Sequence, residues 1–250
     1  MDSLASLARA AGRLLAAVSP ALIDLAEPAP KSPDALRACL AGLVAAYPDA
    51  LARVDETRLY WRDGQATPLR RFAGPRTAEA ILADPDIVDI FAWDYPLGSS
   101  VPSRPGDPGR PRPAAFFQRL YGDCRKGEVQ RRLVDVRWPG GHKVRFTAAH
   151  GAAAALGRAA RVLERLGATA APWLWPLAGT FNCRAIAGTR SPSMHAFGAA
   201  IDLASRHGGY WRWGADRGPP LPPQIVAAFE REGFIWGGKW AHFDTFHFEF

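Results

Sequence analysis

Apolar residues recur at helical spacing in three stretches of the chain. The first begins at the Ser-Pro-Asp of residues 32–34 and is ended by Tyr47-Pro48. The second runs over about residues 152–166 and stops at Gly167, and the third covers about 223–232 and stops at a glycine. Polar caps, proline stops and C-terminal glycines are typical of helix ends, so these stretches predict three amphipathic helices.

Other stretches are typical of short strands and turns. Residues 58–62 precede an Asp-Gly turn, and residues 133–147 show strand, Pro-Gly-Gly turn and strand. Residues 234–236, the segment that ends at Ile201-Asp202, and the last residues of the chain are further strand candidates. Helices and strands are mixed without regular βαβ alternation, which favours an α+β fold.

The 250 residues suffice for one sizeable core, with or without a small appended domain. We expect a mainly helical N-terminal region at 1–125, acting as a cap or a separate targeting module, and a second domain at 126–250. Residues 96–113 are rich in Pro, Gly and Ser and predict a long ordered loop or linker. Residues 1–30 vaguely resemble a secretion signal, and no stretch has the roughly 20 apolar residues of a membrane span.

Composition indicates a folded protein with a basic surface. The apolar fraction is 48%, there are 9 Trp, and 31 basic against 24 acidic residues give a net charge of +7. This charge suits an acidic partner, but the basic residues are dispersed, so we expect no nucleic-acid partner. The three cysteines have no zinc-ribbon spacing; either all are free thiols or one pair is bridged.

Two segments carry candidate chemistry. His195 and Asp202 flank a Gly/Ala/Ile stretch in which small residues allow close backbone packing, so both side chains can lie at one end of a strand. Near the C-terminus, His247 and Glu249 would share one strand face, opposite three phenylalanines. Asp244 could reach a water bound to a metal from a tight turn. Imidazole and carboxylate are zinc ligands, but unrelated surface residues or a core histidine would also fit.

Together the segments resemble the D-alanyl-D-alanine carboxypeptidase family of zinc peptidases, which includes L-alanyl-D-glutamate endopeptidases. The first signature, S-x-H-x-x-G-x-A-x-D, is matched by Ser193, His195, Gly198, Ala200 and Asp202. The second, G-G-x-W, an aromatic, then D-x-x-H-F, is matched by Gly237, Gly238, Trp240, Phe243, Asp244, His247 and Phe248. Both motifs lie in roughly the last 70 residues.

The resemblance implies a small antiparallel sheet with flanking helices that carries a zinc site, as in DD-peptidases and hedgehog-like domains. It implies zinc bound by His195, Asp202 and His247, with an open position for water. Asp244 would accept the proton of this water, and Arg184 would face the substrate and stabilise charge on the carbonyl oxygen. Ser193 would help to hold the site or the substrate, or would be a simple turn residue.

The implied function is hydrolysis of peptidoglycan stem peptides, as a D-Ala-D-Ala carboxypeptidase or an L-Ala-D-Glu endopeptidase. Asp244 and the Phe before His247 are the pattern of the endopeptidase branch. The alternative is a non-catalytic wall-binding or structural module on the same fold. The implied location is the cell envelope, periplasmic or secreted, with the cytoplasm as the alternative.

Three further residue assignments accompany the resemblance. His242 is the main competitor for a ligand role, with a surface position as the other reading. Glu249 projects beyond His247, so we expect it to support the site or the fold and not to act as the base. Cys124 and Cys183 lie in stretches similar to the family, and a disulfide between them would brace the site if the protein is exported.

Overall fold

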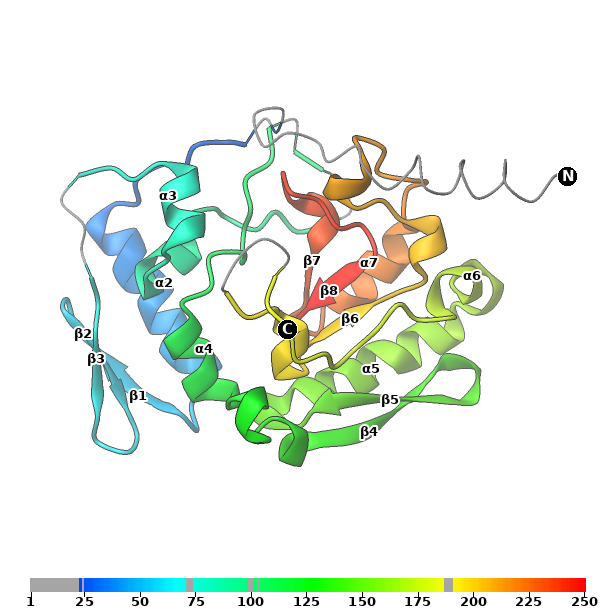
Figure 1. The fold of residues 1–250 in the computed structure, drawn as a ribbon, viewed down its shortest axis with the longest axis horizontal. Helices are drawn as coiled ribbons and strands as arrows, with labels where there is room; N and C mark the ends of the chain where they lie inside the picture. The colour runs from blue at the N-terminus through cyan, green and yellow to red at the C-terminus, as the bar shows by residue number, and fades with distance from the viewer. Residues whose placement is uncertain (1–22, 24, 71–73, 99–100, 103, 187–190) are drawn as a thin grey trace, which may run out of the picture.

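The chain has a mixed fold of helices and small antiparallel sheets. The computed structural model describes residues 23, 25–70, 74–98, 101–102, 104–186 and 191–250. The predicted α+β class is confirmed by this mixture. In Figure 1 the helices α2 and α3 and the strands β1–β3 lie on one side, and the elements from β4 onward lie on the other. Most of the signal-like segment predicted at 1–30 falls outside the described residues.

The N-terminal region begins with helix α2, Pro33–Ala46, as predicted. Ser32 caps it by accepting a hydrogen bond from the backbone N–H of Ala35, and Tyr47 ends it. The described part of this region holds more helix than strand, as expected, but α2 is followed by a small antiparallel sheet of β1 Leu51–Val54, β2 Arg58–Trp61 and β3 Ala66–Pro68. Only β2 was predicted, because it has two aromatic residues before an Asp-Gly turn, whereas β1 and β3 have few aromatic or β-branched residues.

The rest of this region consists of short helices and connecting loops. Helix α3 covers Ala78–Ala83, helix α4 covers Ala114–Tyr121, and the 3-10 helices η2 and η3 cover Ile87–Phe91 and Cys124–Lys126. In the described part of 96–113 there is no helix or strand, in agreement with the predicted loop.

A hairpin and three helices form the framework behind the site. Strands β4 Leu133–Trp138 and β5 His142–Thr147 pair antiparallel around the predicted Pro-Gly-Gly turn. Helix α5, Ala152–Arg165, packs on this hairpin and on α7, Pro223–Glu230, which confirms the second and third predicted helices. The short helix α6, Ala171–Leu174, completes this side of the molecule (Figure 1).

A three-stranded antiparallel sheet in the order β6-β8-β7 carries the predicted motifs. Its strands are Ala200–Asp202, His247–Glu249 and Ile235–Trp236, respectively. Phe248 of the central strand β8 stacks on Phe229 of α7 with ring centroids 4.0 Å apart. This aromatic packing fixes the core face of β8, so the residues that alternate with Phe248 point to the other face.

The two hydrophobic clusters of the described residues divide the molecule differently from the predicted boundary at residue 125. One lies between the hairpin, α5, α7 and the β6-β8-β7 sheet. The other joins α2, β2 and α4 to Met194, Phe197 and Ala200 of the motif-bearing segment. Packing therefore runs across residue 125, while the two-domain division stays a prediction. In the described part of the chain, no helix has the length and apolar character that crossing a membrane requires.

Candidate metal centre

Three side chains with metal-ligating atoms meet at one end of the β6-β8-β7 sheet. Asp202 of β6 and His247 of β8 are direct cross-strand partners, and His195 comes from the 3-10 helix η8, Met194–Phe197, that precedes β6. One ligand atom from each of the three residues can be chosen so that all lie within 4.8 Å of one another. Both histidines are buried, and the Asp202 side chain is 14% exposed.

Each histidine is oriented by a hydrogen bond on the far side of its ring. Nδ1 of His195 donates to the carbonyl oxygen of Thr180, and Nε2 of His247 donates to the Glu249 carboxylate at 2.8 Å. The opposite nitrogens, Nε2 of His195 and Nδ1 of His247, therefore face each other at 3.2 Å beside Asp202. Such outer hydrogen bonds fix which imidazole nitrogen can bind a metal.

The charges of the cluster suit a cation. His247 Nδ1 donates to Asp202 at 2.7 Å. Burial lowers the pKa of His247, but Asp202 and Glu249 on either side raise it to about 10, so the ring is positively charged without a metal. Because Nε2 is held by Glu249, Nδ1 is the nitrogen that can lose its proton to solvent and offer its lone pair to a metal. The donor set of two imidazoles and one carboxylate fits zinc in an open catalytic site.

Close approaches of the backbone explain two glycines of the motifs. Gly198 has φ of 65°, and a Cβ there would lie 2.5 Å from Leu133 of the hairpin. A Cβ on Gly237 would lie 2.7 Å from the carbonyl oxygen of Asp244, whose N–H donates to the carbonyl oxygen of Gly237. A larger residue at Gly198 would push the segment between η8 and β6 away from the hairpin, and one at Gly237 would open the turn that carries Asp244.

Asp244 lines the same cleft as His195 and His247. Its Oδ1 is buried and has no hydrogen-bond partner among the described residues. Burial raises the pKa of Asp244 to about 7, and the nearby Asp202 charge acts in the same direction, while His247, Arg110 and Arg184 act against it. A carboxylate that is poorly solvated and unpaired beside a metal-ligand cluster has the properties of a general base.

The structure brings the two other predicted site residues to the same cleft. Ser193 is the N-cap of η8, where its hydroxyl accepts a hydrogen bond from the backbone N–H of His195, so it helps to hold this histidine. Arg184 is exposed and lines both this cleft and a neighbouring pocket. The backbone of Arg184 accepts a hydrogen bond from the N–H of Ser193, which ties the two residues together.

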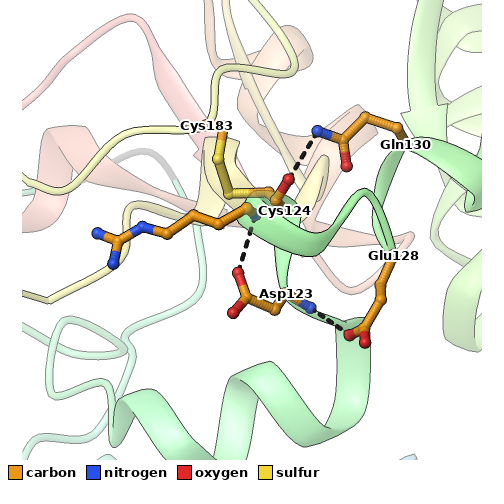
Figure 2. Close-up of a disulfide and its surroundings, with 6 residues drawn as sticks. Asp123, Cys124, Glu128, Gln130 and Cys183 are labelled. Carbon is orange, nitrogen blue, oxygen red and sulfur yellow. Dashed lines mark hydrogen bonds between the residues drawn. A yellow bond between two sulfur atoms is a disulfide. The ribbon is translucent and has the colours of Figure 1, made fainter.

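A disulfide joins Cys124 to Cys183, the residue before Arg184 (Figure 2). This settles the alternatives left open for the cysteines, with Cys39 as the free thiol. The segment that bears Cys124 is itself held in place. The Gln130 side chain donates to the carbonyl oxygen of Cys124 at 2.8 Å, and Glu128 accepts from the backbone of Asp123 at 2.8 Å. The bridge therefore anchors the Arg184 loop to the η3 segment.

The loop of residues 104–112, here named the strap, forms hydrogen bonds with the segment just before Asp244. The carbonyl oxygen of Gly106 accepts from the backbone of Ala241, and that of Pro108 accepts from the indole N–H of Trp240 at 2.7 Å. Asp107 is fully buried and accepts hydrogen bonds from the backbone and ring of His242. The N-terminal region therefore helps to shape the site.

His242 lies outside the group of three ligands. Its ring contacts Asp107 and the edge of Trp211. The competing ligand role is therefore not supported by the geometry, and the expected surface position is also incorrect, because the side chain is 16% exposed.

Glu249 is buried against His247 and Arg112, as its expected supporting role requires. Burial raises the pKa of Glu249, but Arg112 and His247 outweigh this and lower it to about 2.

Sequence reasoning missed several residues of this cleft. Arg110 and Arg112 line it, and Thr180 orients His195 through a backbone oxygen. Tyr210 was not missed, because its loop is rich in aromatic residues, a pattern typical of a substrate wall, and it lines the cleft. Tyr210 also forms a backbone bridge with Asp244. Arg110 and Arg112 lie in a Pro-rich loop with no recognisable pattern, so only their spatial neighbours mark them as part of the site.

Comparison with known proteins agrees with the motifs. Residues 187–250 match the family model described as D-alanyl-D-alanine carboxypeptidase. The predicted family resemblance is confirmed. This D-alanyl-D-alanine carboxypeptidase-like segment covers about a quarter of the chain and contains all three ligand candidates and Asp244. The match supports a peptidase. The searches of curated proteins and of solved structures found no match.

Removal of the disulfide tests its bracing role. The bridge closes a loop with a sequence separation of 59 residues. We expect the double variant Cys124→Ser/Cys183→Ser to lower the free energy of unfolding by about 2–4 kcal/mol, measured by urea denaturation, because its unfolded chain is less constrained. Cys39→Ser is the control and should change it by less than about 1 kcal/mol. Equal losses in both variants would contradict the bracing role.

The raised pKa of Asp244 predicts a pH-dependent stability. The folded chain binds the proton of the Asp244 carboxyl more tightly than the unfolded chain does. The free energy of unfolding therefore decreases as pH rises from about 4 to 7, because the unfolded chain loses this proton first. Asp244→Asn, which cannot ionise, should therefore be more stable than the wild type at pH 8 by more than about 1 kcal/mol, and nearly equal at pH 4. Denaturant titrations of the metal-free proteins at both pH values measure this. A wild type that is the more stable at pH 8 would contradict the assigned environment.

Proposed function

We propose that this protein is a zinc-dependent peptidase that hydrolyses peptide bonds in peptidoglycan stem peptides. One observation carries the proposal: two oriented imidazoles and a carboxylate converge beside the carboxylate of Asp244, whose buried Oδ1 has no hydrogen-bond partner among the described residues. A structural zinc site is closed by four protein ligands, whereas a catalytic site has three and an open position. Three ligand candidates and a neighbouring base therefore favour catalysis.

In this proposal His195, Asp202 and His247 hold the metal. Zinc, when bound, would polarise the scissile carbonyl and lower the pKa of a water toward about 7. Asp244 accepts the proton of the attacking water and passes it to the leaving amine. Its position on the turn directly before β8 keeps this carboxylate beside the ligands, since the backbone N–H of His247 donates to the carbonyl oxygen of Asp244.

The walls of the cleft suit a peptide with free carboxylates. Arg184 lines it together with the aromatic residues Tyr210 and Trp240, while the two other arginines of its lining, Arg110 and Arg112, are paired with Asp107 and Glu249. Arg184 is exposed at the cleft, where it can stabilise negative charge that develops on the carbonyl oxygen. Ser193 acts mainly through His195, and we propose a substrate contact for it as a second role. No nucleic-acid partner is proposed.

Stem peptides are proposed as substrates because the matched family is described as D-alanyl-D-alanine carboxypeptidase. Both a terminal D-Ala and an internal L-Ala-D-Glu bond remain candidates for cleavage. The Cys124–Cys183 disulfide favours an oxidising compartment, so we propose a periplasmic or secreted location. A wall-binding module without activity is the second candidate. It requires that the ligand cluster binds no metal or that Asp244 transfers no proton.

Metal content and hydrolysis test the proposal together. The wild type should contain about one zinc per chain by elemental analysis and release products from muropeptides, with the cleaved bond identified by mass spectrometry. His247→Ala should lose both zinc and activity, because a ligand is removed. Asp244→Ala should keep zinc but lose activity by roughly 100-fold or more, since the base is absent.

His207→Ala is the matched control. His207 packs against Trp173 outside the ligand group, so this variant should keep both zinc and activity. A wild type without zinc after reconstitution, or a fully active Asp244→Ala, would overturn the peptidase proposal. Muropeptide binding without hydrolysis would favour the wall-binding module.

A further inference from the structure

A chain of buried contacts links the strap to one of the proposed metal ligands. Arg112 forms an ion pair with Glu249, and both side chains are 5% exposed. The same oxygen of Glu249, Oε2, accepts the hydrogen bond from Nε2 of His247 at 2.8 Å. The guanidinium of Arg112 also lies over the ring of Trp240, with its carbon 5.9 Å from the ring centroid. Arg112 is therefore held from two sides while it contacts Glu249.

The physical need for Arg112 follows from the burial of Glu249. A buried carboxylate without a cation is costly to desolvate, so its side chain turns toward water where it can. Glu249 lies on β8 with 4% of its surface exposed and is paired in register with Ala200 and Ile235 of the neighbouring strands, so its backbone cannot move away. The ion pair with Arg112 holds this side chain in the buried position in which it contacts His247.

The orientation of His247 depends on that carboxylate. While Nε2 donates to Glu249, the ring presents Nδ1 to Asp202 and to Nε2 of His195. If Glu249 turns away, the ring can rotate about its side-chain bonds, and Nδ1 is no longer held toward the other ligands. Partners that orient ligand histidines typically contribute 10–100-fold to metal affinity.

We propose that Arg112 is a positioning residue of the metal centre, which acts through Glu249 to orient His247. This inference rests on the proposed metal site. It means that a residue of the N-terminal region, 137 positions before Glu249 in the sequence, completes a site whose ligands all lie after residue 190. The strap is thus a functional part of the site and not only a linker.

Zinc affinity of the full chain tests this proposal, measured by competition with a chromophoric chelator. Arg112→Met should weaken zinc binding by about 10–100-fold, and Arg112→Lys, which keeps the charge, should recover part of the loss. Arg76→Met is the matched control. It removes another mostly buried ion pair, Arg76–Asp89, in a different part of the fold, and should stay within about 3-fold of the wild type.

A double-mutant comparison separates positioning from general damage. In the background of Glu249→Gln, which has no charge to neutralise, Arg112→Met should change zinc affinity by less than about 3-fold. If Arg112→Met weakens zinc binding equally in both backgrounds, or leaves it unchanged in the wild-type background, the proposal is wrong. If Arg112→Met alone does not fold, Arg112→Lys is compared in the two backgrounds instead, and its loss of zinc affinity should likewise disappear in the Glu249→Gln background.

A second readout needs no metal. In the metal-free wild type, the Nε2–H proton of His247 should give a hydrogen-bonded, slowly exchanging NMR signal. This signal should exchange faster in Arg112→Met and remain slow in Arg76→Met, while an unchanged signal in Arg112→Met would overturn the inference. If the wild type binds no zinc yet the NMR result holds, the proposed function fails and the orienting role of Arg112 stands.

Discussion

The antiparallel pairing of β6 with β8 is the constraint on which the candidate site depends. It places Asp202 opposite His247 and leaves Ile201 and Phe248 on the other face of the sheet. Phe248 is fully buried and stacks on Phe229 of α7, so the register cannot shift without exposing this aromatic core. The same packing that stabilises the C-terminal core therefore holds the carboxylate and the imidazole together.

Around this pair, most polar groups are held by a buried polar partner. Thr180 orients His195, Glu249 orients His247, and Arg112 neutralises Glu249. Buried polar groups are costly unless they are satisfied, so these contacts make a precise cluster possible in a mostly apolar environment. Asp244 is the exception, because its Oδ1 has no partner among the described residues. An unsatisfied carboxylate at this position is destabilising for the fold and useful for proton transfer.

The sequence was most informative where the pattern is local. Ser193, His195 and Asp202 are close in sequence, and Gly198 fits between them because its positive φ and the nearby Leu133 exclude a side chain. The three predicted helices were also recognisable from caps and periodicity. Arg112 and Thr180 could not be predicted, since they meet the site only through the tertiary fold. The short strands β1 and β3 were missed because Leu-Ala-Arg-Val and Ala-Thr-Pro have few of the aromatic and β-branched residues that mark strands.

The central claim is that one metal ion binds among His195, Asp202 and His247. Anomalous diffraction at the zinc edge, from crystals of the full chain grown with zinc, tests it most directly. We expect one strong peak bonded to Nε2 of His195, Nδ1 of His247 and the Asp202 carboxylate, at about 2.0–2.2 Å from each ligand atom. A peak at His242 and Asp107 instead, or no peak in the cleft at saturating zinc, would contradict the account.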